Sequence, residues 1–220
     1  MDASPAGRRL EIDTRWGRAA VDLDIPPGVP ASLLVLGHGA GGDVDAPDLV
    51  AVRDLALTAG VVVARMTQPY RVAGRRSPAP AGHLDGAFAA VVEAVVEQAP
   101  APALVVGGRS SGARVACRTA GGLGAAGVVA LAFPLHPPRR RGEAARSGAD
   151  EAADRSRAGE LATGRPTLVV NGDRDPFGVP VPSANVRVVV RPGERHDLRR
   201  DPDGVAAVVV DWMRSGGWAR

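Results

Sequence analysis

Short apolar runs separated by longer amphipathic stretches recur through most of the 220-residue chain. The runs consist largely of Val, Leu and Ala, and they lie at 32–37, 61–65, 103–107, 127–133, 167–171 and 186–190. They lack the alternation of apolar and polar residues that marks a strand with one face in water. Continuous apolar runs of this length predict strands that are buried on both faces of a parallel sheet.

The stretches between these runs carry apolar residues at helical spacing. Such stripes occupy 49–59, 84–95 and 205–212, and a helix of smaller residues is expected at 113–120. Parallel neighbouring strands require a crossover connection, which is usually a helix. The pattern therefore predicts the α/β class, with a mostly parallel central sheet and helices on both faces.

The beginning of the chain has a different pattern. Segments 10–13 and 19–25 alternate apolar and polar residues on either side of Trp16 and Gly17, which predicts an antiparallel hairpin at the sheet edge. The length suits one domain, so we expect a single domain over 1–220. Disordered ends are expected at 1–7 and 214–220.

Composition excludes several kinds of chemistry. All 27 basic residues are Arg, and without Lys there is neither a Walker phosphate loop nor a Schiff base. The only Cys, Cys117, rules out an internal disulfide and a thiolate zinc site, and we expect it to be a small buried residue. The four His residues show no HExxH spacing. We therefore do not expect a metal site.

Charge and the N-terminal sequence limit the partners. A net charge of only +3 and an aromatic content of 3% argue against nucleic-acid binding. The N-terminus lacks the apolar core of a signal peptide, and no uninterrupted apolar stretch is long enough for a membrane helix. A cytoplasmic protein that binds a small molecule, without nucleic-acid or membrane partners, is the expectation.

A candidate nucleophile follows the apolar run at 103–107. Gly108-Arg109-Ser110-Ser111-Gly112 has the pattern GxSxG between a predicted strand and a predicted helix. A sharp turn there would expose the Ser110 hydroxyl at the sheet edge, and glycines on both sides would remove colliding side chains. Ser110 as a simple helix cap is the alternative.

A serine nucleophile needs a base and an acid, which follow it in the order Ser, Asp or Glu, His in this type of fold. Asp173 and Asp175 follow the run at 167–171, and His196 follows the run at 186–190. We predict His196 as the base, although a solvated loop histidine would look the same. The spacing leaves both aspartates open as the acid.

An oxyanion hole needs backbone N–H groups aimed at the developing charge. We predict one from Ser111, after the nucleophile, and one from Ala40 or Gly41 in the glycine-rich turn after the first buried strand. His38 and His136, together with Arg109, are predicted near the substrate pocket.

Several segments resemble those of a known family: HGAGG at 38–42, QPYR at 68–71, GGRSSGAR at 107–114, FPLHPP at 133–138 and GDRDPFG at 172–178, with the loop of His196. The chain resembles small, lidless α/β-hydrolases related to dienelactone hydrolase, most closely the subfamily of testis-expressed and KANL-type α/β-hydrolase-like proteins. The resemblance implies a triad of Ser110, Asp175 and His196, no cofactor, and hydrolysis of an ester-like bond. It departs from dienelactone hydrolases proper at Ser110, where those enzymes use Cys.

The substrate is expected to be a small ester, lactone or thioester. Only 33 residues lie between Phe133 and Thr167, and they must include a crossover helix, so a large lid has no room and the pocket should be open. An acidic substrate beside Arg109 and the arginines at 139–141 is a further hypothesis.

Two other functions are compatible with parts of the sequence. Gly37, Gly39 and Gly42 match the dinucleotide fingerprint GxGxxG after a strand, and Arg65 would suit the phosphate of NADP. An oxidoreductase that binds NADP is therefore one alternative. Some eukaryotic members of the resembled family act as subunits of complexes, so a noncatalytic interaction module on the same fold is the other.

Overall fold

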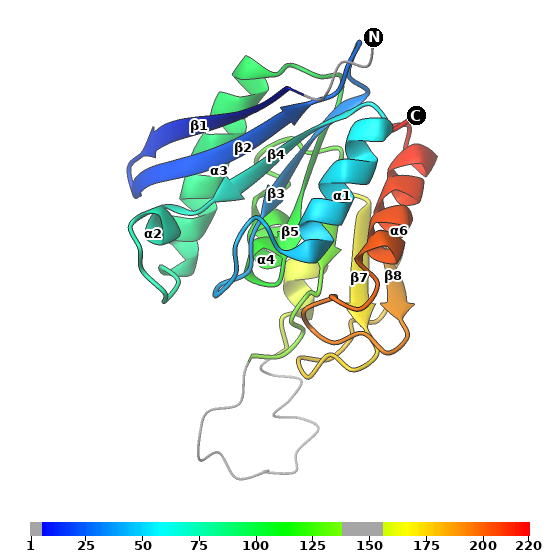
Figure 1. Cartoon of the computed structure of the whole chain (residues 1–220). Coiled ribbons are helices and arrows are strands. Elements are labelled where there is room, and N and C mark those ends of the chain that lie inside the picture. The colour runs from blue at the N-terminus through cyan, green and yellow to red at the C-terminus, as the bar shows by residue number, and fades with distance from the viewer. Residues whose placement is uncertain (1–5, 138–155) are drawn as a thin grey trace.

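A single eight-stranded sheet forms the centre of the computed structural model, which describes residues 6–137 and 156–220 (Figure 1). The strands follow the spatial order β1-β2-β4-β3-β5-β6-β7-β8. Their bounds are β1 Ala6–Thr14, β2 Gly17–Ile25, β3 Ser32–Gly37, β4 Val61–Thr67, β5 Leu104–Arg109, β6 Gly127–Leu131, β7 Thr167–Gly172 and β8 Val186–Arg191. Every predicted strand is present, and the ends lie within two residues of the prediction except at β1, which begins four residues earlier, at Ala6.

Strands β3 to β8 run parallel, whereas β1 pairs antiparallel with β2 and β2 with β4. The predicted edge hairpin is thus confirmed. The carboxyl ends of the parallel strands all lie at the same end of the sheet, and ligands usually bind there in such folds. The ends of β3 and β5 are neighbours there, with Gly37 opposite Gly108.

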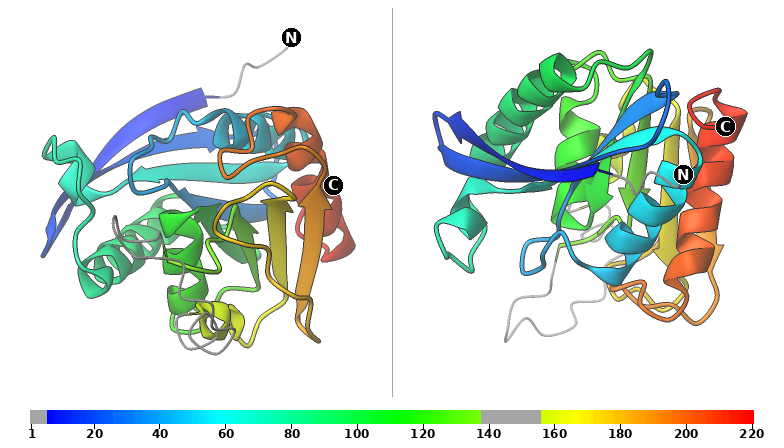
Figure 2. Two further views of the ribbon diagram at one scale, coloured as in Figure 1. Left: turned by 90° about the horizontal axis from the view of Figure 1, so that it is seen from below. Right: turned by 45° about the horizontal axis from the view of Figure 1, so that its top comes forward.

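Helices cover both faces of the sheet, as predicted. Helices α1 (Pro47–Thr58) and α6 (Pro202–Ser215) pack against each other on one face, and α3 (Ala81–Gln98) and α4 (Ser111–Thr119) pack together on the other (Figure 2). Apolar side chains form a separate buried cluster under each pair. The short helices α2 (Pro69–Val72) and η1 (Ala158–Leu161) complete the described elements. The crossover expected between 133 and 167 falls mainly on 138–155, outside the described residues.

The C-terminal segment differs from expectation, because 214–220 packs against the protein instead of being disordered. The indole of Trp218 meets that of Trp212 edge-on at 5.1 Å, and the Arg220 amide donates a hydrogen bond to the Ala59 carbonyl at 2.9 Å. The two indoles share apolar contact area that the local sequence pattern does not reveal. No helix within 6–137 and 156–220 is long and apolar enough to cross a membrane.

Candidate active site

Ser110 occupies the sharp turn between β5 and α4. Its backbone has φ 54° and ψ −110°, a conformation that residues with a side chain rarely adopt. Its amide donates a hydrogen bond to the Leu131 carbonyl at 2.9 Å. The hydroxyl makes no capping hydrogen bond to α4, so the simple cap alternative does not describe it. Strain of this kind is characteristic of positions where a side chain must be presented at a defined place.

The two glycines of the GxSxG pattern are required by close backbone packing. A Cβ atom would lie 2.5 Å from the Gly37 carbonyl oxygen at Gly108, and 2.3 Å from the same oxygen at Gly112. Both distances are far below van der Waals contact. The absence of these side chains lets α4 approach the end of β3, and this approach brings Ser110 beside the glycine-rich turn.

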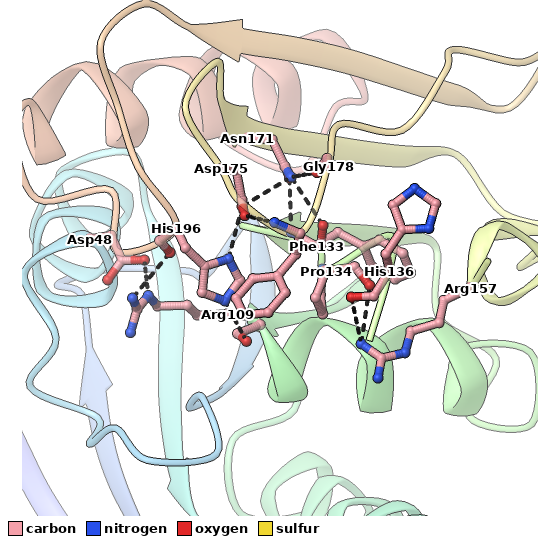
Figure 3. Close-up of polar contacts among 12 residues, drawn as sticks. Asp48, Arg109, Phe133, Pro134, His136, Arg157, Asn171, Asp175, Gly178 and His196 are labelled. Carbon is pink, nitrogen blue, oxygen red and sulfur yellow. Dashed lines mark hydrogen bonds and ion pairs between the residues drawn. The ribbon is translucent and has the colours of Figure 1, made fainter. Parts of the chain in front are cut away.

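Ser110, His196 and Asp175 form a hydrogen-bonded chain across three segments that are distant in sequence (Figure 3). The Ser110 hydroxyl lies 2.8 Å from Nε2 of His196, and Nδ1 of His196 lies 2.8 Å from Oδ2 of Asp175. The network assigns the imidazole proton to Nδ1, which leaves Nε2 as the acceptor for the serine proton. The Phe177 ring meets the imidazole edge-on at 4.5 Å and restricts its tilt.

The two candidate acids have different surroundings. The Asp175 side chain is fully buried, and its Oδ1 accepts a hydrogen bond from the Phe177 amide at 2.9 Å. Asp173 is exposed and accepts a hydrogen bond from the Gly193 amide at 2.7 Å, which anchors the loop that carries His196. Asp175 therefore contacts the histidine, whereas Asp173 supports its loop.

Two further polar residues were not anticipated from the sequence. Asn171, at the end of β7, is fully buried and exchanges hydrogen bonds with both backbone groups of Phe133, at 2.8 and 3.0 Å, while its amide also reaches Asp175 at 3.4 Å. The Glu194 carboxylate is buried and accepts hydrogen bonds from the amides of Arg200 and Asp201. A polar residue at the end of an apolar run was the available signal for Asn171.

The amides predicted for the oxyanion hole lie in the glycine-rich turn and at the start of α4. The Gly42 amide donates to the Gly39 carbonyl at 3.0 Å, which closes a turn with Ala40 and Gly41 at its centre. Within the described residues, the amides of Ala40, Gly41 and Ser111 have no hydrogen-bond acceptor. Ser111 begins α4, where the amides carry the positive end of the helix dipole.

His38 is buried and does not line the cavity described below. Its Nδ1–H donates a hydrogen bond to the Gly39 carbonyl at 2.7 Å, and its Nε2 accepts one from the backbone N–H of Gln68 at 3.1 Å. Both ring nitrogens are therefore occupied, and burial lowers the pKa of the imidazole. The residue shapes the glycine-rich turn, and its predicted place at the substrate is corrected.

Arg109 and His136 also make internal contacts. The Arg109 side chain is only 14% exposed, with Nε 3.2 Å from Oδ2 of Asp48 and Nη2 donating to the His196 carbonyl at 3.2 Å. His136 is half-buried, and its amide donates to the Phe177 carbonyl at 2.9 Å. The acidic-substrate hypothesis loses Arg109, because that guanidinium is already paired, and the arginines at 139–141 lie outside the described residues.

The Arg65 side chain, which was predicted to suit the phosphate of NADP, is likewise engaged within the protein. Arg65 is buried and donates to the Val44 carbonyl at 2.9 Å and to Asp45 at 3.1 Å. Among residues 6–137 and 156–220, no group of three or more His, Cys, Asp or Glu side chains is arranged to hold a metal ion.

A cavity of about 550 Å³ lies at the same end of the sheet, between the β1–β2 turn, α2 and α3. Trp16, Tyr70 and His83 are among its lining residues, but none of the three residues of the hydrogen-bonded chain is. Its link to the site is indirect, through the Tyr70 hydroxyl, which donates to the Ala40 carbonyl at 2.7 Å. The chemically organised place is therefore the surface around Ser110.

Comparisons with known proteins agree with the fold. XC6422 from Xanthomonas campestris, described as an α/β serine hydrolase without a lid, superposes with a TM-score of 0.73 at 20% identity, covering 98% of this chain and 96% of its own. Est1E from Butyrivibrio proteoclasticus gives 0.74 at 18% identity, covering 96% and 99%. A dienelactone hydrolase from Anabaena variabilis gives 0.72 at 17% identity, covering 96% and 98%.

The curated proteins contain no significant match to the sequence. The family described as alpha/beta hydrolase domain matches residues 30–199, from the strand before the glycine-rich turn to the loop beyond His196. The chain therefore belongs to the α/β-hydrolase family.

Proposed function

We propose that the protein is a serine hydrolase that cleaves a small ester, lactone or thioester through a Ser110, His196 and Asp175 triad. The observation that carries the proposal is the pair of 2.8 Å contacts that joins the three side chains in the order required for nucleophilic catalysis. The complete burial of Asp175 and the strained backbone of Ser110 support the same roles.

Acylation follows from these contacts. Nε2 of His196 takes the hydroxyl proton while Oγ of Ser110 attacks the carbonyl carbon, and the carbonyl π electrons move to its oxygen. The amides of Ser111 and of Ala40 or Gly41 stabilise this oxyanion, each donor being worth about 3–4 kcal/mol of barrier. When the tetrahedral intermediate collapses, His196 returns the proton to the leaving oxygen or sulfur, and an ester on Ser110 remains.

Deacylation repeats the sequence with water. His196 accepts a proton from the water as its oxygen attacks the acyl carbon, and then returns that proton to Oγ of Ser110 as the carboxylic acid leaves. Asp175 remains ionised throughout, holds the imidazole proton at Nδ1 and stabilises the imidazolium. The chemistry of each half-reaction is complete without a cofactor.

The substrate size is inferred from the limited chain length between Phe133 and Thr167 and from the lidless relative described above. We propose short acyl or cyclic substrates. A panel of p-nitrophenyl esters from acetate to palmitate, together with a dienelactone, tests this: rates should fall as the acyl chain lengthens. A preference for palmitate would contradict the open site.

The first test needs no knowledge of the substrate. Intact-mass analysis after treatment with a fluorophosphonate should show one adduct on the native chain and none on Ser110→Ala or His196→Ala. Asp175→Asn should lower esterase kcat by about 10³–10⁴-fold, and Asp173→Asn by less than about tenfold, because only Asp175 contacts the imidazole. A folded native chain that forms no adduct would favour the noncatalytic interaction module.

A further inference from the structure

A buried ion pair contacts the backbone of the proposed triad. Asp48, in the first turn of α1, has a fully buried side chain whose Oδ2 lies 3.2 Å from Nε of Arg109. Neither carboxylate oxygen has a well-aligned hydrogen-bond donor within the part of the chain that the structure describes, although the backbone amides of Leu49 and Asp48 lie close enough to favour its charged form. Because the loss of hydration of a buried carboxylate outweighs these contacts, such a pair is poorly explained as a source of stability.

The Arg109 guanidinium contacts several parts of the site at once. It leaves the backbone one residue before the nucleophile, and its Nη2 donates to the carbonyl oxygen of His196 at 3.2 Å (Figure 3). Its Nη1 lies under the glycine-rich turn, where a Cβ atom at Gly42 or Gly39 would come within 3.6 or 3.7 Å of it. One side chain therefore connects α1, the turn near the oxyanion amides and the loop of the base.

The contact with His196 is made at the base itself. The other polar anchors of this loop act before or after it: Asp173 holds the Gly193 amide, and Glu194 holds two amides beyond Leu198. The His196 side chain is 21% exposed, so packing alone does not enclose it. Displacing a catalytic group by 1 Å can cost about 10²-fold in rate, so an anchor on the carbonyl of His196 matters for proton transfer.

We propose that Arg109 is a positioning residue that holds His196 in register with Ser110, and that the buried carboxylate of Asp48 orients its guanidinium. This inference rests on the hydrolase activity proposed above and extends its machinery by two residues. Arg109 does not touch the reacting atoms and acts through the backbone of His196. Direct binding of substrate is disfavoured, because Asp48 and the His196 carbonyl already engage the guanidinium.

The test compares Arg109→Met, Arg109→Lys, Asp48→Asn and the double variant Asp48→Asn/Arg109→Met with the native chain. The readouts are kcat and KM for p-nitrophenyl acetate, the rate of fluorophosphonate adduct formation, and folding by circular dichroism. Arg118→Met is the control, because it removes a partly buried guanidinium that pairs with Asp85 at 2.6 Å and with Glu160 at 3.2 Å but makes no contact with the loop of His196.

We expect Arg109→Met to lower kcat and the labelling rate about 10- to 100-fold, while KM stays within about threefold. Arg109→Lys should recover little, because one ammonium cannot span both partners. Asp48→Asn should cause a smaller loss, and the double variant should be no slower than Arg109→Met, because both residues act through one contact. Arg118→Met should keep kcat within about twofold.

A folded Arg109→Met with native kcat and labelling rate would overturn the positioning role while leaving the proposed hydrolase intact. An equal loss in Arg118→Met would overturn it as well, by showing a general effect of ion-pair removal. If Arg109→Met does not fold, native rates in both Arg109→Lys and Asp48→Asn decide against the proposal. A native chain that is neither labelled nor active fails at the earlier step, the hydrolase activity itself.

Discussion

The buried carboxylate of Asp48 should give the protein an unusual dependence of stability on pH. Burial, with a small contribution from the charge of Asp197, raises the pKa of Asp48 to about 6 from an ordinary value of 3.8, despite the opposing effects of Arg109 and of nearby backbone amides. The folded state therefore binds more protons than the unfolded state between these two pKa values. In that window stability must fall as the pH rises.

The magnitude follows from the shift. About two units at 1.36 kcal/mol each amount to a cost of about 3 kcal/mol, which is absent below pH ~4 and complete above pH ~6. Between pH 4.5 and 7.5 about 2 kcal/mol of it should appear. This is opposite in sign to an ordinary ion-paired carboxylate, whose pKa is lowered by folding and whose stabilising contribution grows as the pH rises toward the unfolded pKa.

Asp48→Asn isolates this effect, because an amide of the same shape carries no titrating charge. Urea unfolding of both proteins, followed by tryptophan fluorescence at several pH values, gives the free energy of unfolding for each. The native value minus the variant value should fall by about 2 kcal/mol from pH 4.5 to 7.5. Loss of the partner of Arg109 adds only a constant offset, since Arg109 stays charged throughout.

Taking the difference between two proteins cancels the titration of every group that they share. A difference that stays constant within about 0.5 kcal/mol from pH 4.5 to 7.5 would refute the argument from burial. A difference that grows with pH would show that the attraction of Arg109 outweighs the loss of hydration.

Three further changes test other parts of the structure. Gly112→Ala should lower the free energy of unfolding by at least about 2 kcal/mol and abolish fluorophosphonate labelling, because its Cβ atom would lie 2.3 Å from the Gly37 carbonyl oxygen. The control Gly82→Ala, at a position with open space around it, should change the free energy of unfolding by less than about 1 kcal/mol. Equal effects of the two substitutions in urea unfolding would contradict this. Asn171→Ala should lower the free energy of unfolding by about 3 kcal/mol, because it leaves buried backbone groups without partners, and a loss below 1 kcal/mol would argue against its clamping role. Burial raises the pKa of the Cys117 thiol to about 12, so this thiol should not react with Ellman's reagent at pH 8 until urea unfolds the chain. Rapid reaction of the native protein would show that the thiol is accessible.

The arrangement of the site also separates residues by the task they perform. Ser110, His196 and Asp175 form the proposed reacting chain, while Asp173 and Asn171 hold the segments on which it stands. A catalytic geometry that spans three loops needs such supports, because each loop could otherwise move independently. The supports are buried or bonded to backbone, and their removal should affect rate and stability together.

The local pattern of the sequence was enough to predict the strands, the main helices and the turn that presents Ser110. Apolar runs at 32–37 and 103–107 and helical stripes between them depend only on neighbouring residues, so periodicity carries this information without any knowledge of distant contacts. The order of Ser110, an aspartate and His196 along the chain was likewise sufficient to nominate the three residues.

Only the tertiary structure decided which polar groups meet. The spacing could not distinguish Asp173 from Asp175, and Asp175 reaches His196 because β7 and β8 are neighbours in the sheet. The pairing of Arg109 with Asp48 was also beyond local pattern, because α1 brings Asp48 against it from 61 positions earlier in the chain. The same local sequence is compatible with a polar side chain that binds a ligand, solvent or another part of the protein. The elements that bury the side chain, which come from distant parts of the chain, determine which of these partners it has.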